Sequence, residues 1–105
     1  MAMTLTSKQR AYLRSLAQNI TATFQVGKEG VTPELTAAVE ESFHTRELVK
    51  LSVLRTVDED LRTVGDMIAG RTRSTLVEVI GRKIVLYKQD PDNPQIVLPK
   101  AAPKA

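Results

Sequence analysis

The chain contains no cysteine and no tryptophan, and its 105 residues include only two tyrosines and two phenylalanines. Without cysteine, the sequence excludes a disulfide framework, a thiolate metal site and a cysteine nucleophile. The single histidine, His44, has no second histidine with which to complete a zinc site. No phosphate-binding or dinucleotide-binding motif is present, and no serine has the surroundings of a catalytic nucleophile. The sequence therefore predicts a protein that is not an enzyme and holds no cofactor or metal.

Long apolar runs are also missing. No segment approaches the ~20 apolar residues of a membrane-spanning helix, and the first eight residues lack the apolar stretch of a signal peptide. We therefore expect a cytoplasmic protein that has no membrane or small-molecule partner. A chain of 105 residues is long enough for one domain that buries roughly 65% of its unfolded surface.

The net charge of +3 hides a segregation of charge along the chain. Residues 1–28 carry four basic residues and no acid, and residues 71–88 carry five basic residues and one acid. Residues 29–70 carry nine acids and four basic residues. If the two basic segments fold side by side, they form a positive face opposite an acidic one. Chance clustering on a solvated surface explains this pattern equally well.

Three segments have helical periodicity and start signals. In the first, Thr6 and Gln9 have capping-box spacing, and apolar residues then recur at helical intervals through Ile20. A second helix begins at Thr32 as N-cap with Pro33 in the first turn, and its apolar stripe ends at Phe43. The third is predicted to be capped by Asp58 and to end near Gly70.

Four segments have the composition of strands: 21–26, 48–54, 74–80 and 83–88. The second is mostly apolar, which favours a central position, and only Gly81-Arg82 separates the last two, as in a two-residue hairpin. The order is therefore α-β-α-β-α-β-β. Strands connected through helices favour parallel pairing, and the hairpin adds an antiparallel pair. We predict a compact two-layer α/β domain with a mixed four-stranded sheet.

Four of the five prolines lie beyond Gln89. This composition predicts that residues 1–88 form the domain and that residues 89–105 form an extended or disordered tail. Within the tail, Ile96-Val97-Leu98 is the segment able to dock on the sheet edge, although docking is the less favoured alternative.

The segment with the clearest functional chemistry is Gly27-Lys28-Glu29-Gly30, between a predicted strand and a predicted helix. Glycine lets backbone N–H groups approach a ligand without interference from a Cβ atom. A following helix N-terminus adds partial positive charge. Such a loop is suited to a phosphodiester backbone, although a tight turn without a ligand explains the glycines as well.

Four segments in order resemble the bacterial YhbY-like proteins, which are stand-alone versions of the CRM domain (chloroplast RNA splicing and ribosome maturation). They are residues 5–14, 26–30, 47–51 and 79–87, and the resemblance covers residues 4–88 in register. It implies an RNA-binding fold similar to the C-terminal domain of bacterial translation initiation factor three. It also implies association with precursors of the large ribosomal subunit, whereas plant relatives act in organellar intron splicing.

In this family the GxxG loop belongs to the RNA-contacting surface, which implies that role for Gly27, Lys28 and Gly30. Glu29 departs from the family pattern, because its carboxylate would repel phosphate unless it points away or contacts a base edge. Basic residues near the loop and on the first helix extend the predicted surface. The full set of predicted RNA-contacting residues is Lys8, Arg10, Arg14, Gly27, Lys28, Glu29, Gly30, Arg71, Arg73 and Arg82. For the arginines and Lys8, an ordinary solvated surface is the competing interpretation.

The alternative function is a protein-interaction module. The acidic face of the second helix, with Glu34 and Glu41, or the free hairpin edge would then dock a ribosomal or assembly protein. Glu40, Glu41 and Glu47 have the pattern of solvated charges rather than of a catalytic pair. Phe24, Phe43 and Tyr87 fall in core patterns, which favours packing over base stacking.

Overall fold

The computed structural model describes residues 5–92 and 94–98. Its three helices and four strands follow the predicted order. They are α1 (Ser7–Ala17), β1 (Phe24–Val26), α2 (Pro33–Ser42), β2 (Leu48–Val53), α3 (Leu61–Thr72), β3 (Thr75–Ile80) and β4 (Lys83–Tyr87). The first strand is shorter than the predicted 21–26, and Leu54 lies just beyond β2.

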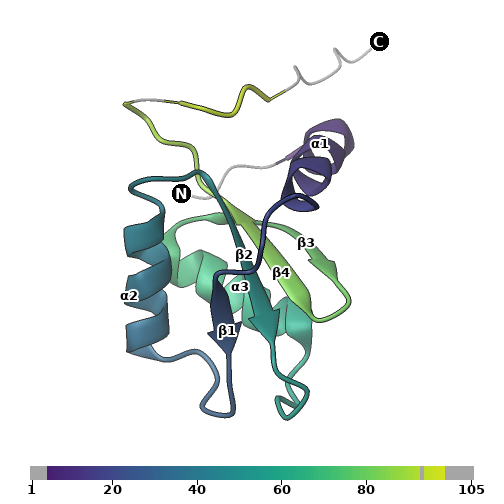
Figure 1. The fold of residues 1–105 in the computed structure, drawn as a ribbon, viewed down its shortest axis with the longest axis vertical. Helices are drawn as coiled ribbons and strands as arrows, with labels where there is room; N and C mark the ends of the chain where they lie inside the picture. The colour runs from purple at the N-terminus through teal and green to yellow at the C-terminus, as the bar shows by residue number, and fades with distance from the viewer. Residues whose placement is uncertain (1–4, 93, 99–105) are drawn as a thin grey trace.

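The strands form one mixed sheet in the order β1-β2-β4-β3 (Figure 1). β1 pairs with β2 in parallel, and β4 pairs antiparallel with both β2 and β3. The predicted central position of β2 is confirmed. β4 takes the other central position, and its last four residues are all buried. The hairpin at Gly81-Arg82 thus places β3 at the sheet edge, and Gly81 has the positive φ of 58° that favours glycine.

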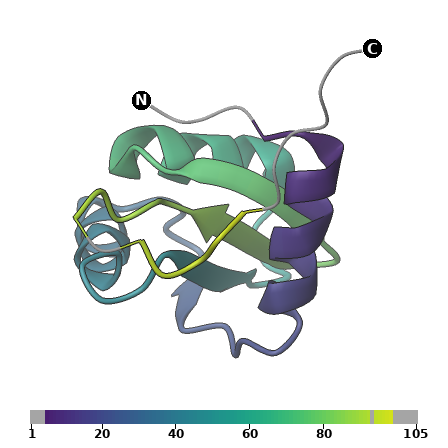
Figure 2. The same ribbon diagram turned by 90° about the horizontal axis from the view of Figure 1, so that it is seen from above.

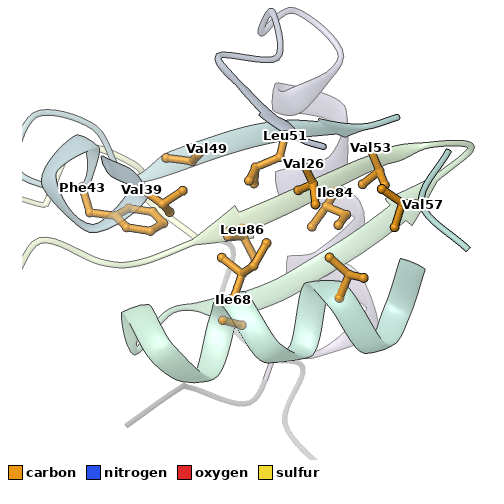
Figure 3. Close-up of a cluster of buried hydrophobic side chains, with 12 residues drawn as sticks. Val26, Val39, Phe43, Val49, Leu51, Val53, Val57, Ile68, Ile84 and Leu86 are labelled. Carbon is orange, nitrogen blue, oxygen red and sulfur yellow. The ribbon is translucent and has the colours of Figure 1, made fainter. Parts of the chain in front are cut away.

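The fold class is confirmed, but the domain has three layers rather than the predicted two. One buried cluster joins α2 and α3 to one sheet face, through residues such as Val39, Ile68 and Leu86 (Figure 3). A second cluster joins α1 to the opposite face, through Leu13 and Val85. Figure 2 shows α1 and α2 on opposite sides of the strands. The reason is that β2 and β4 carry apolar side chains on both faces, so each face requires a helix.

Side chains cap the helix N-termini largely as predicted. Thr6 and Gln9 form the capping box of α1, and the Thr32 hydroxyl accepts from the Leu35 N–H at 3.1 Å. The prediction for α3 was wrong by two residues: Asp60, not Asp58, accepts from the Thr63 N–H at 3.2 Å. This helix also runs past Gly70 to Thr72.

Two lysines of the sheet region cap helix C-termini. The Lys50 ammonium donates to the carbonyls of Ala17 and Ile20, at 3.2 and 3.3 Å, where α1 ends. The Lys88 ammonium donates to the Thr72 carbonyl at 3.1 Å, at the end of α3. Cations at these positions complement the partial negative charge of a helix C-terminus. Lys88 therefore stabilises the end of α3, although the charge pattern counted it among the cations of a basic segment.

The prediction that Glu47 is a solvated carboxylate was wrong, because this residue is only 3% exposed. Three backbone N–H groups of the tail, from Asp90, Gln95 and Ile96, donate to its oxygens at 2.7, 2.8 and 2.6 Å. No local pattern signals this burial, since the partners lie more than 40 positions away and are backbone groups.

The described part of the tail, residues 89–92 and 94–98, is therefore anchored to the domain. Ile96 and Leu98 pack against the α1-side cluster, while Val97 is 81% exposed. Docking of the segment 96–98 was the less favoured alternative, and it does occur. The segment lies on a sheet face beside α1, however, and not on the sheet edge as predicted (Figure 2). The part of the tail prediction that concerns residues 93 and 99–105 lies outside the described residues.

The fully buried Tyr87 leads to a first prediction. Its hydroxyl has no hydrogen-bond partner among the described residues. Burial first, and the Glu47 carboxylate second, raise the pKa of Tyr87 above its ordinary value of 10.0. The unfolded chain therefore loses this proton at a lower pH than the folded chain. The raised pKa therefore contributes to the free energy of unfolding. This contribution is fully present below the ordinary pKa of about 10 and is lost as the pH rises through the pKa of the folded state.

We expect Tyr87→Phe to remove that alkaline component of stability. At pH 8 the substitution should change the free energy of unfolding by no more than about 1 kcal/mol, because the hydroxyl makes no bond that would be lost. Urea unfolding of both proteins at pH 8 and at pH 10.5 measures the difference. Parallel losses of stability in the two proteins above pH 10 would contradict the assignment.

Candidate nucleic-acid interface

The loop between β1 and α2 forms a closed turn at one end of the sheet. The Gly30 N–H donates to the Gly27 carbonyl at 2.9 Å, and Gly30 has a φ of +74°. Only Gly30 therefore needs glycine for its backbone conformation, because a Cβ on Gly27 would meet the Leu54 side chain at an ordinary 3.7 Å. Lys28 and Glu29 stand exposed at the tip of the turn.

Three loops meet at this end of the sheet (Figure 1). Val26 and Val53 are register partners at the ends of β1 and β2, so the segments that follow them start side by side. The β3–β4 hairpin joins them through Arg82, whose guanidinium donates to the carbonyls of Val53, Leu54 and Val57. Arg82 was predicted to contact RNA, but the structure places its donors on the β2–α3 loop.

Sequence reasoning missed Arg55 at this end. Arg55 lies two residues beyond Val53, as Lys28 lies two residues beyond Val26, and both side chains are exposed. Neither forms an ion pair with another described residue. Arg55 was overlooked because it belongs to the acidic middle segment, and only the sheet register brings its loop to the same end of the sheet as the GxxG turn. Lys83, at the start of β4, is also exposed.

Acids lie among these cations. Glu29 is exposed in the turn itself, and a Cβ on Gly30 would come within 3.5 Å of a Glu59 carboxylate oxygen. The electrostatic field at this end is therefore mixed. The surface beside the turn is hollowed by an open depression of about 320 Å³. Its lining residues are Gln25, Gly27, Lys28, Glu29, Gly30, Thr32 and Leu35.

The cations of α1 lie away from this loop, toward the opposite end of the molecule (Figure 1). The Arg10 guanidinium donates to the carbonyls of Leu76 and Val77, where the pairing of β3 with β4 is irregular. Arg14 forms an ion pair with Glu78 at 3.5 Å, and Lys8 is exposed. α1 thus packs against β3 of the second basic segment, but its cations there meet backbone carbonyls and Glu78 rather than the basic residues of that segment, and Lys28 is not part of this contact.

Arg71 and Arg73 lie at the end of α3. The Arg71 guanidinium reaches the Val31 carbonyl at 3.4 Å, which links α3 to the segment just beyond Gly30. Arg73 is the C-cap of α3 and has a left-handed backbone with a φ of 58°. Of the ten predicted residues, the structure thus gathers Gly27, Lys28, Glu29, Gly30 and Arg82 at one end, with Arg71 beside them, and separates Lys8, Arg10, Arg14 and Arg73.

Comparison with known proteins identifies the family. The model of the CRS1/YhbY (CRM) domain matches residues 5–88. The chain belongs to this family. The CRM domain thus spans α1 to β4 and includes the GxxG turn, as the resemblance implied, while the segment that Glu47 anchors lies beyond it.

Relatives that match most of this chain are named as RNA-binding proteins. The Bacillus subtilis protein named "Probable RNA-binding protein YqeI" is 45% identical over 95 residues, which cover 90% of this chain and 99% of that protein. A Haemophilus influenzae protein named "RNA-binding protein" is 29% identical and covers 92% of this chain and 97% of its own length. None of these names describes catalysis, in agreement with the prediction that the chain is not an enzyme.

A solved structure shares the fold. A solution structure of a Staphylococcus aureus protein, described as a candidate RNA-binding protein, superimposes on this CRM domain with a TM-score of 0.79 at 41% identity. The match covers 91% of this chain and all of that one.

The described ranges, 5–92 and 94–98, offer neither a metal site nor a membrane span. No group of three or more histidine and carboxylate side chains is arranged there to hold a metal ion. None of the helices in these ranges has the length and apolarity required to cross a membrane.

Proposed function

We propose that this CRM domain binds RNA, and that it grips the backbone at the sheet end formed by the GxxG turn and the β2–α3 loop. The observation that carries the proposal is that the β1–β2 register starts the loops that carry Lys28 and Arg55 at the same end of the sheet. Both are exposed, and neither has an ion-pair partner among the described residues. The names of the relatives support RNA as the ligand.

The chemistry of this end suits the phosphate backbone rather than a base sequence. Lys28 and Arg55 supply charge, Gly27 leaves the backbone accessible, and the N-terminus of α2 adds partial positive charge nearby. Phosphate contacts fix position and register without reading sequence. Glu29 and Glu59 oppose the approach of phosphate, so the domain should bind RNA through a few contacts and with moderate affinity.

The finer proposal is that the RNA is ribosomal and that the protein assists assembly of the large ribosomal subunit in the cytoplasm. The resemblance to the YhbY-like proteins supports this step. The competing function is a protein-interaction module that docks a ribosomal or assembly protein through the exposed acids of α2. RNA contact would then be incidental.

Sedimentation of a cell lysate on a sucrose gradient tests the finer proposal. We expect the protein to migrate with precursors of the large subunit, and to return to the free-protein fractions after ribonuclease treatment under conditions that leave protein complexes intact. Migration that survives ribonuclease would favour the protein-interaction function. Residence in the free-protein fractions of untreated lysate would contradict the ribosomal proposal.

A further inference from the structure

Tyr12 is the one aromatic side chain that the fold leaves on the surface. The sequence has four aromatic residues, and all four lie in the described ranges. Phe43 and Tyr87 are buried in the two core clusters, and Phe24 is partly buried against the first. Tyr12 is 39% exposed and belongs to neither cluster. Core packing therefore accounts for three aromatic residues and does not account for the fourth.

The helix that carries Tyr12 has no acidic residue, and exposed polar residues share its flank. α1 buries Leu13 and Ala17, so Tyr12 stands on a flank of the helix. Lys8 precedes it by one turn on the same flank, and four helical residues advance by about 6 Å. Ser15 and Asn19 follow on that side and are exposed. No aspartate or glutamate occurs between residues 5 and 28.

The opposite flank of α1 is already occupied. Arg10 donates to carbonyls of β3 and Arg14 pairs with Glu78, so both cations are held against the sheet edge. Lys8 has no such partner among the described residues. The flank with Lys8 and Tyr12 therefore presents a free cation beside an exposed aromatic ring.

We infer that this flank of α1 is a second RNA contact, in which Tyr12 stacks on an unpaired base and Lys8 pairs with a neighbouring phosphate. The inference rests on the proposed function and adds the kind of RNA that is bound. An aromatic face accepts any base, and a cation one helical turn away suits the adjoining phosphate. A protein partner would instead require an exposed apolar patch, whereas the exposed residues within one turn on this flank, Lys8 and Ser15, are polar, and Leu16 packs against the α1-side cluster.

The two contacts lie toward opposite ends of the domain (Figure 1). The GxxG end binds through phosphates, which duplex and single strands both offer. Stacking on Tyr12 needs a base that is free of pairing, because bases in a helix are already stacked on each other. The α1 flank therefore makes the domain prefer RNA with a single-stranded segment over a continuous duplex.

Binding of a single-stranded RNA oligonucleotide and of a matched duplex tests the inference. We expect Tyr12→Ala to weaken single-strand binding about five-fold or more, since one stacked base contributes about 1–3 kcal/mol. Duplex binding should be unchanged, and Tyr12→Phe should bind both RNAs like the natural chain. Met67→Ala is the matched control, because Met67 is similarly exposed on α3.

A fluorescence measurement gives a readout that a merely structural role would not change. The chain has no tryptophan, so Tyr12→Trp places a single reporter on α1, and base stacking should quench its emission when single-stranded RNA is added. Unchanged single-strand affinity of Tyr12→Ala, or unquenched emission upon binding, would overturn the α1 contact alone. Failure of the natural chain to bind either RNA would overturn the proposed function as well.

Discussion

Raising the salt concentration from 50 to 200 mM should lower the affinity of this protein for single-stranded RNA about fifty-fold. At the two proposed contacts, the exposed cations that have neither an ion pair nor a side-chain hydrogen bond to another described residue are Lys8, Lys28, Arg55 and Lys83. If each neutralises one phosphate, the logarithm of affinity falls with the logarithm of salt with a slope of about −2.8. Filter binding or fluorescence anisotropy across this range measures the slope.

The double variant Lys28→Ala, Arg55→Ala should reduce the magnitude of that slope by about 1.4, so that the same salt change costs only about seven-fold. Arg46→Ala is the matched control, because Arg46 is an exposed arginine that precedes β2, whereas Arg55 follows it. Glu29→Gln should raise affinity at low salt, since it removes a negative charge from the turn. Equal slopes for the double variant and the natural chain would show that the RNA backbone does not contact this end.

Glu47→Ala should destabilise the folded protein by about 2–4 kcal/mol, which lowers the melting temperature by roughly 10–20 °C. The buried carboxylate accepts three backbone N–H bonds from the tail, and hydrogen bonds to a charged group are stronger than those between neutral groups. Its loss releases Ile96 and Leu98 from the α1-side cluster as well. Thermal unfolding followed by circular dichroism measures the change.

Glu41→Ala is the control for the Glu47→Ala prediction, because the Glu41 carboxylate is exposed and lies 3.8 Å from the exposed imidazole of His44. It should change stability by less than about 0.5 kcal/mol. Removal of residues 89–105 should abolish most of the effect of Glu47→Ala, since the carboxylate then has no tail to hold. A full-sized effect in the shortened chain would show that Glu47 stabilises something other than the tail.

The helices, the strands and their order could be predicted from local patterns. Thr6 and Thr32 mark helix starts through bonds that span only three residues. Pro33 favours the first turn of α2 through its fixed φ, and Gly81-Arg82 marks the hairpin. The predicted packing of Phe24, Phe43 and Tyr87 is confirmed for the same reason, because apolar periodicity reports burial. The GxxG turn also formed where its sequence placed it.

The sequence by itself thus determined the elements, the core and the position of the turn, since each depends on residues close together in the chain. Only the tertiary structure decided which charged side chains are held by contacts within the protein and which stay exposed. Sheet register starts the loops of Lys28 and Arg55 at the same end of the sheet, and the packing of α1 brings Arg10 to the carbonyls of β3. Packing of the tail buries Glu47 under tail amides. Charged side chains are long and their partners are often backbone groups, which no residue pattern identifies. Whether a cation is free for a ligand therefore depends on contacts that exist only after folding.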